Sequence, residues 1–202
     1  MNYDYEQNLI SQGYNIICGI DEAGRGSLAG PLVAGAVVLD FEKQDLFEKL
    51  NDSKLLSGKK REELCPLIID QALAWSIGLA TNEEIDKHGL AFANKIAMKR
   101  AWKHLSIKPD FIVSDYLAKL SFETPFELVI KGDRKIVSVA AASIIAKVFR
   151  DRMMLAYHNK YPTYCFDVHK GYGTELHMDR LKILGPCEIH RKSFGPVRAR
   201  LF

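Results

Sequence analysis

Short apolar runs alternate along the chain with longer segments of helical periodicity, a pattern typical of a sheet covered by helices. Short, largely apolar runs predict strands at residues 15–20, 31–39, 74–80, 111–114 and 126–130, the first of them buried. Apolar residues three and four positions apart predict helices from Ser57 onward and at residues 89–105, 138–158 and 175–184. We therefore expect an α/β fold formed by the whole chain, because 202 residues fit one domain.

The composition of the chain indicates the cellular compartment of the protein. The longest apolar run, residues 32–39, is far shorter than the ~18 residues that a membrane span needs. The N-terminal segment is polar and acidic, unlike a signal peptide. The four cysteines are widely spaced and form no CxxC pair, which is typical of reduced thiols. We expect a cytoplasmic protein that does not bind membranes.

Charge is distributed unevenly along the chain. Residues 131–202 contain 14 Lys and Arg against 6 Asp and Glu, a net charge of +8. Residues 1–130 contain 14 against 19, a net charge of −5. A basic C-terminal third on an acidic body is typical of a polyanion-binding face with a separate carboxylate cluster, although solvated helices decorated with Lys and Arg give the same pattern.

Acidic residues occur where three of the predicted strands end. Asp21 and Glu22 follow the first strand, Asp115 the fourth, and Asp133 comes shortly after the fifth. If these strands are neighbours, four carboxylates meet at one rim of the sheet, where their repulsion requires a cation. Oxygen ligands favour Mg²⁺ or Mn²⁺, and two such ions ~4 Å apart can bind a phosphodiester. The alternative is that each acid caps a turn or pairs with a nearby Lys or Arg.

A glycine-rich segment, GIDEAGRGSLAG at residues 19–30, contains the first two acids. Its spacing is GxGxxxG rather than the GxGxxG of a dinucleotide-binding turn, and a Val-rich strand follows where that motif requires a helix. We interpret the segment as a turn that another backbone can approach closely, with Arg25 available to pair with a phosphate. The alternative is a plain β-turn with a solvent-facing arginine.

Several motifs in a fixed order carry a resemblance to a known family. They begin with DEAGRG at residues 21–26, GPLVAGAV at 30–37, DSKL at 52–55, KGD at 131–133 and AAASIIAKV at 140–148. The remaining motifs are RDR at 150–152, KGYGT at 170–174 and HRKSF at 190–194. On these motifs the chain resembles type 2 ribonucleases H, the bacterial ribonuclease HII family, over almost its whole length.

The resemblance implies a ribonuclease H-like fold: a five-stranded mixed sheet flanked by helices, with a helical C-terminal extension from about residue 160 to residue 202. It implies an endonuclease that hydrolyses the RNA strand of RNA–DNA hybrids and cuts 5′ to ribonucleotides embedded in duplex DNA. The products are a 3′-hydroxyl and a 5′-phosphate. The catalytic metal ligands it implies are Asp21, Glu22, Asp115 and Asp133, with Asp21 bridging two Mg²⁺ or Mn²⁺ ions.

The resemblance also implies substrate contacts. Gly24, Arg25 and Gly26 would contact the ribose 2′-hydroxyl, the group that distinguishes RNA from DNA. Tyr172 would stack on the deoxyribose that follows the ribonucleotide, so that the site requires an RNA-to-DNA junction. Taken without the family, Tyr172 in its cluster of tyrosines is more typical of a half-buried packing residue.

Three further residues, Lys54, Ser143 and Lys147, are expected to reach phosphates of the nucleic acid. Solvated charges and a capping hydroxyl are the alternatives. Tyr116 departs from the family, which commonly has a glycine after the third aspartate. We expect this departure to alter the local loop and to leave Asp115 as a ligand.

Two other functions remain open. The first is a nucleic-acid-binding module that has lost catalysis, which four acids facing phosphates argue against. The second is a zinc site formed by Cys165, His169, Cys187 and His190, whose spacing does not match the usual finger arrangement.

The C-terminal tail gives one interaction hypothesis. It is basic and ends in Leu201 and Phe202, and it is loosely similar to short peptides that bind replication sliding clamps. A frayed basic terminus is the alternative. We expect the protein itself to be a monomer.

Overall fold

The computed structural model describes residues 4–43, 50, 57–115 and 117–200. Its centre is a five-stranded mixed sheet, as the family resemblance implies, and the strand order is β3-β2-β1-β4-β5. The strands are β1 (Ile17–Ala23), β2 (Leu32–Leu39), β3 (Ala72–Ala80), β4 (Phe111–Asp115) and β5 (Phe126–Val129). Strands β1, β2 and β3 pair antiparallel, whereas β4 runs parallel to β1 and to β5.

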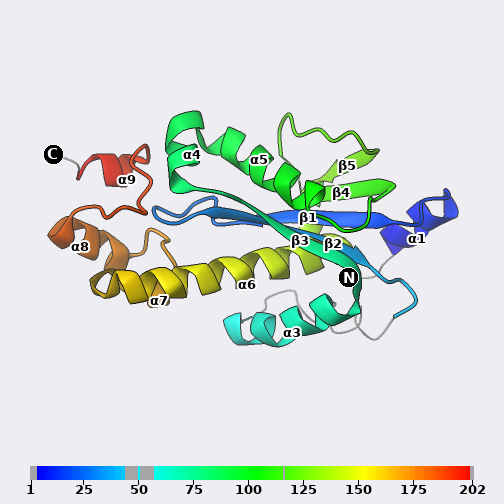
Figure 1. Cartoon of the computed structure of the whole chain (residues 1–202), viewed down its shortest axis with the longest axis horizontal. Helices are drawn as coiled ribbons and strands as arrows, with labels where there is room; N and C mark the ends of the chain where they lie inside the picture. The colour runs from blue at the N-terminus through cyan, green and yellow to red at the C-terminus, as the bar shows by residue number, and fades with distance from the viewer. Residues whose placement is uncertain (1–3, 44–49, 51–56, 116, 201–202) are drawn as a thin grey trace.

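Helices cover both faces of this sheet, which confirms the α/β class (Figure 1). The long helices are α3 (Gly58–Gln71), α5 (Leu90–Lys103) and α6 (Val137–Lys160). Apolar residues of α5 pack with β1 and β2 on one face, and those of α3 and α6 pack on the other. The shorter helices are α1 (Asp4–Ser11), α4 (Asn82–His88), α7 (Phe166–His169), α8 (Glu175–Leu184) and α9 (Gly195–Arg198), with 3₁₀ turns η1 (Gly132–Arg134) and η2 (Pro162–Tyr164).

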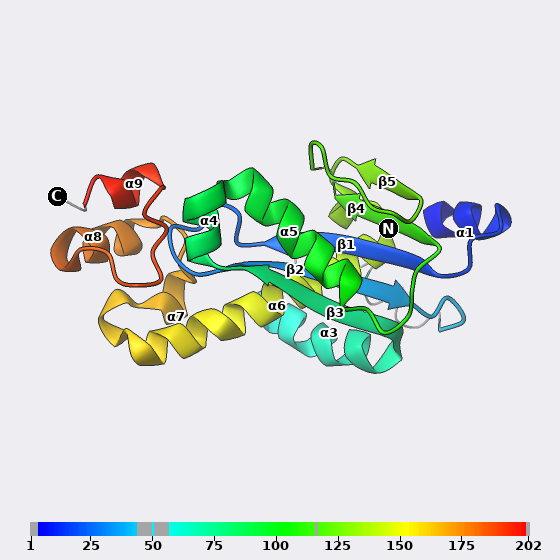
Figure 2. The same cartoon turned by 45° about the horizontal axis from the view of Figure 1, so that its top comes forward.

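The C-terminal helices lie at the end of the molecule opposite α1, where the connection between β1 and β2 reaches them (Figures 1 and 2). Helix α8 has the predicted bounds. Residues 161–174, where no helix was predicted, contain η2 and α7. These elements are too short to produce a helical period in the sequence.

Three other differences from the expected elements have physical causes. Strand β1 continues to Ala23, so Asp21 and Glu22 lie within the strand rather than beyond its end. Helix α4 was not expected because it has only seven residues, although Thr81 and Glu84 form a capping box at its start. Helices α1 and α9 were also not expected, and both are short, with eight and four residues.

Helix α6 lies in backbone contact with the sheet because β1 and β2 present glycines to it. A Cβ at Gly19 would lie 2.1 Å from the Ser138 carbonyl carbon, and one at Gly35 would lie 2.4 Å from the Ala142 carbonyl oxygen. Only glycine permits such an approach. The contact brings the middle of α6 next to the second half of β1, where the two acids lie.

Among the described residues, no helix combines the length and apolar character that crossing a bilayer requires.

Replacing Gly35 with alanine should destabilise the protein strongly, because the new methyl group meets the backbone of α6 and not a movable side chain. We expect a loss of about 1–3 kcal/mol or more in the free energy of unfolding, measured by urea denaturation. Gly195→Ala is the matched control, because its added Cβ meets nothing within 4 Å. Equal midpoints for the two variants would show that α6 moves away from the sheet at little cost.

Candidate active site

Asp21 and Asp115 occupy equivalent positions on two neighbouring parallel strands. The pairing of β1 with β4 ends at Ile20 and Ser114, and each acid is the next residue. The condition for the acids to converge at one rim, that the acid-bearing strands are neighbours, is met by β1, β4 and β5, which are consecutive in the sheet. On the other side of β1, pairing with β2 continues through Asp21 and Glu22 to Ala23.

Successive residues of a strand face opposite sides of a sheet, so Asp21 and Glu22 diverge. Asp21 is 6% exposed and faces α6, where Ser143 and Lys147 are its neighbours. Glu22 faces α5, where Asn94 lies beside its carboxylate. The Glu22 Oε1 atom is also 3.8 Å from Nη1 of Arg25. The two carboxylates can serve one ligand only at the end of the sheet, where both faces are reached.

The electrostatics of this acid pair are unfavourable without a cation. Burial raises the pKa of Asp21 to about 8, and the nearby Glu22 carboxylate adds to this effect. Burial also raises the pKa of Glu22, with Asn94 and Arg25 acting in the opposite direction and Asp115 adding repulsion. Two partly desolvated carboxylates that repel each other favour a hard divalent cation as a partner.

The backbone brings Asp133 close to Asp115. The Gly132 N–H donates a hydrogen bond of 3.0 Å to Oδ1 of Asp115, and Asp133 is the next residue, in η1. Within the described part of the chain, no three Asp, Glu, His or Cys side chains are grouped closely enough to hold a metal ion. The donor set nevertheless fits Mg²⁺ or Mn²⁺ by its chemistry, because all four side chains supply carboxylate oxygens.

The glycine-rich segment forms a tight turn beside this rim. Gly24 has φ +90°, and a Cβ there would lie 2.0 Å from Nε of Arg150. Gly26 has open space around it, and the Arg25 side chain is 52% exposed. The close backbone approach expected here is made by Tyr172, which forms a β-bridge with Ser27.

Tyr172 lies next to this turn with its ring partly open to solvent. The side chain is 40% exposed, and the Arg150 guanidinium carbon lies 5.1 Å from the ring centroid. The backbone is held from the turn side by the Ser27 bridge and by a 2.8 Å hydrogen bond from the Leu28 N–H to the Gly171 carbonyl. The structure thus brings together the turn and the tyrosine that the sequence motifs single out.

Two fully buried arginines that received no role from the sequence hold the turn in place. Arg150 donates to the carbonyls of Ala29, Pro31 and Lys170 at 3.2, 3.0 and 2.9 Å. Arg191 donates to the carbonyls of Arg25 and Gly30, both at 3.0 Å. Each arginine lies inside a sequence motif that carries the family resemblance, and this position could have indicated a role. The sequence does not show, however, that the partners of the arginines are backbone carbonyls.

The remaining predicted contacts have mixed outcomes. Ser143 is 4% exposed and lies beside Asp21. It could therefore contact only a phosphate that is bound at the acid site itself. Lys147 is half-buried at the same place. Lys54 and Tyr116 lie outside the described residues.

The alternative zinc site is not formed. Both ring nitrogens of His169 are bonded to backbone groups, those of Tyr164 and Gly171. Cys187 Sγ does lie 3.1 Å from Nδ1 of His190, but that nitrogen also accepts the Cys187 N–H. Cys165 contacts the Thr163 carbonyl instead. These groups therefore do not converge on a common point among the described residues.

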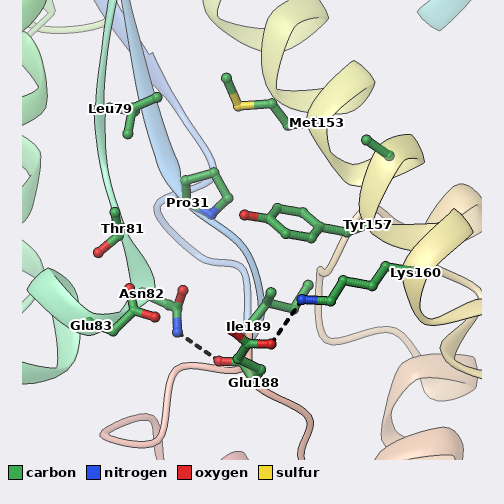
Figure 3. Close-up of a pocket in the computed structure, with 11 residues that line it drawn as sticks. Pro31, Leu79, Thr81, Asn82, Glu83, Met153, Tyr157, Lys160, Glu188 and Ile189 are labelled. Carbon is green, nitrogen blue, oxygen red and sulfur yellow. Dashed lines mark hydrogen bonds and ion pairs between the residues drawn. The ribbon is translucent and has the colours of Figure 1, made fainter.

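A cavity of about 570 Å³ lies elsewhere, between the end of β3, the C-terminal half of α6 and the loop around Glu188 (Figure 3). Tyr157 points across it toward Pro31, and Lys160 forms an ion pair of 3.0 Å with Glu188 at its edge. None of the predicted site residues lines this cavity. We therefore place the candidate site at the acidic rim, by which we mean the end of the sheet that carries Asp21, Glu22 and Asp115, with Asp133 close to it.

Comparison with solved structures defines the class of protein. The crystal structure of the ribonuclease H2 from Pyrococcus horikoshii shares 30% identity and a TM-score of 0.77, with 92% of this chain and 96% of that chain covered. Ribonuclease HII in a complex with PCNA from Archaeoglobus fulgidus shares 29% identity and a TM-score of 0.70, with coverage of 83% and 86%. The fold is thus that of a ribonuclease H.

Sequence comparison narrows this class to one family. The ribonuclease HII family model matches residues 18–197. The ribonuclease HII of Chlamydia caviae is 46% identical over 195 residues, which cover 96% of this chain and 91% of that protein. The chain belongs to the ribonuclease HII family and is a ribonuclease H endonuclease.

The raised pKa of Asp21 predicts a pH-dependent stability. The folded protein keeps a proton on Asp21 between about pH 4 and pH 8, whereas the unfolded chain has lost it. This contribution is therefore present below about pH 4 and is lost as the pH rises through about 8. We expect the unfolding free energy of the metal-free wild type, relative to Asp21→Asn, to fall as the pH rises from about 5 to about 8.

Chemical denaturation of both proteins across this pH range checks the prediction, since the difference between them cancels the titrating groups that do not interact with Asp21. Adding Mg²⁺ at about pH 8 should stabilise the wild type more than the variant. A difference that stays constant with pH would show that Asp21 is ionised in the folded protein throughout.

Proposed function

We propose that this ribonuclease HII hydrolyses the RNA strand of RNA–DNA hybrids and cuts 5′ to ribonucleotides embedded in duplex DNA, leaving 3′-hydroxyl and 5′-phosphate ends. The observation that carries the proposal is the position of the acidic rim directly beside the Gly24-Arg25-Gly26 turn and Tyr172. Carboxylates for phosphodiester chemistry and groups able to recognise a sugar thus share one edge of the sheet.

Asp21, Glu22, Asp115 and Asp133 are the proposed ligands of two divalent ions, Mg²⁺ or Mn²⁺. When bound, such ions activate water and stabilise the leaving oxygen. Asp21 is positioned for this role by its burial between β1 and α6, and Asp115 by the hydrogen bond from Gly132. Lys147 lies near Asp21 and is proposed to approach the substrate phosphate from the α6 side.

Recognition of the ribonucleotide is assigned to the turn and to Tyr172. Backbone groups of Gly24 and Gly26 and the exposed Arg25 side chain are the proposed contacts of the 2′-hydroxyl, which can both donate and accept a hydrogen bond. The partly exposed Tyr172 ring is the proposed stacking surface for the following deoxyribose. Arg150 beneath the ring limits the orientations that the ring can adopt.

We also propose a cytoplasmic monomer that acts in the excision of ribonucleotides from DNA. The four cysteines are free thiols, in keeping with a reducing compartment. Residues 160–202 are proposed as a helical extension of one ribonuclease H domain. The short helices α7, α8 and α9 at one end of the sheet support this assignment.

Cleavage of a labelled DNA duplex containing one ribonucleotide tests the proposal. With Mg²⁺ or Mn²⁺ we expect cutting 5′ to the ribonucleotide, no cutting with EDTA, and none by Asp21→Asn. Tyr172→Ala should reduce kcat/KM about tenfold, the scale of one lost stacking contact. An Asp70→Asn variant on the surface of α3 serves as the matched control.

Each result separates the parts of the proposal. Cutting of long RNA tracts alone, unaffected by Tyr172→Ala, would overturn the junction assignment and leave the carboxylate site standing. Binding without cutting under either metal would instead indicate the inactive binding module.

The tail is proposed to bind a sliding clamp, as a ribonuclease HII of Archaeoglobus fulgidus forms a complex with PCNA. Leu201 and Phe202 lie outside the described residues. We expect deletion of these two residues to reduce retention of the protein on immobilised clamp by about tenfold, because two buried apolar side chains would be lost. Equal retention of the full chain and the shortened chain in a pull-down would exclude this mode of binding.

A further inference from the structure

Three buried histidines lie next to one another and next to the Tyr172 backbone. His169 ends α7, His177 lies in the first turn of α8 and His190 follows that helix. Their exposed fractions are 5%, 0% and 0%. The His169 and His177 rings stack with centroids 4.2 Å apart, and His177 is bonded to His190. We call these three residues the histidine chain; the proposed function gives them no role.

Backbone groups fix the tautomers of the first two rings. The Gly171 N–H can only donate, so Nδ1 of His169 accepts it at 3.1 Å, and Nε2 carries the ring hydrogen that is donated to the Tyr164 carbonyl at 2.7 Å. The Tyr172 carbonyl can only accept, so His177 donates to it from Nδ1 at 2.9 Å. Nε2 of His177 is then left as an acceptor.

The third ring completes the pattern. The Cys187 N–H donates to Nδ1 of His190 at 3.0 Å, so the hydrogen of His190 is on Nε2. That atom lies 3.1 Å from the accepting Nε2 of His177. All bonds are satisfied at once only when the three rings are neutral, and burial lowers the pKa of both His177 and His190 to about 4, which keeps them so at neutral pH.

The histidine chain connects two segments that flank the turn. Tyr172, bonded through its carbonyl to His177, forms the β-bridge to Ser27. His190 forms a second bridge, to Ala29. The hydrogen bond between His177 and His190 therefore completes a closed series of contacts around residues 27–29. This series sets the position of Tyr172 relative to the turn.

We propose that His177, held in its tautomer by His190, is a positioning residue that sets Tyr172 against the Gly24-Arg25-Gly26 turn and thereby gives the enzyme its selectivity for RNA-to-DNA junctions. This inference rests on the proposed function, in which Tyr172 and the turn contact the substrate. A purely structural histidine would instead affect stability and leave selectivity unchanged.

Two amide variants separate the two hydrogen bonds of His177. His177→Asn can place an N–H where Nδ1–H was and so keep the bond to the Tyr172 carbonyl. His177→Gln can place its oxygen near the former Nε2, which keeps the bond from His190 and loses the one to Tyr172. His104→Gln, an exposed histidine at the end of α5, is the control.

Steady-state kinetics on a single-ribonucleotide duplex and on a long RNA–DNA hybrid give the test. For His177→Gln we expect kcat/KM on the single-ribonucleotide duplex to fall about tenfold, as for one lost buried hydrogen bond, with kcat on the long hybrid within about twofold of wild type. His177→Asn should retain the selectivity of the wild type. In a Tyr172→Ala background, His177→Gln should have no further effect on selectivity.

Other outcomes overturn the inference in distinguishable ways. Equal selectivity of wild type and His177→Gln, or an additive loss with Tyr172→Ala, would refute positioning while leaving the proposed function intact. A wild type that does not cut the single-ribonucleotide duplex would refute the proposed function first. If the variants do not fold, imidazole ¹⁵N shifts of the wild type decide, because His177 protonated on Nε2 rather than on Nδ1 is incompatible with the proposal.

Discussion

Arg150 carries its positive charge at a point with no solvent exposure. Removing such a charge from water is costly unless hydrogen bonds replace the lost hydration, and here the carbonyls of Ala29, Pro31 and Lys170 do so. These carbonyls come from segments about 140 residues apart in sequence, so satisfying one guanidinium brings the turn and the Tyr172 segment together. Gly24 is required for the same reason, because a side chain there would collide with Arg150.

The acidic rim depends on a second constraint, the contact between the α6 backbone and two glycines of the sheet. That contact leaves Asp21 little water and makes its ionisation unfavourable. Glu22, one residue on, faces the opposite side of the sheet and has a different set of neighbours. The site is therefore a pair of unequal carboxylates at a sheet end, poised to gain stability from a bound cation.

Much of this arrangement could be predicted from the sequence. The short apolar runs predicted the five strands, and the family resemblance implied that these strands form a mixed sheet. The sequence placed Asp21 and Asp115 each directly after such a run but left open whether the two strands are neighbours, which the pairing of β1 with β4 shows. Short helices such as α4 could not be predicted, because seven residues are too few to show a helical period in the sequence. The roles of Arg150, Arg191 and the histidine chain also could not be predicted. Most of their partners are backbone atoms, which every residue type has, so the sequence does not identify them.

The turn between β1 and β2 is completed by residues near the other end of the chain. Arg191 contacts Gly30 across 161 positions of sequence, and Ala29 pairs with His190. During synthesis, the first strands of the sheet can form long before these partners have left the ribosome. The turn therefore takes its final form only after Arg191 has been synthesised, 161 residues after Gly30 in the turn itself.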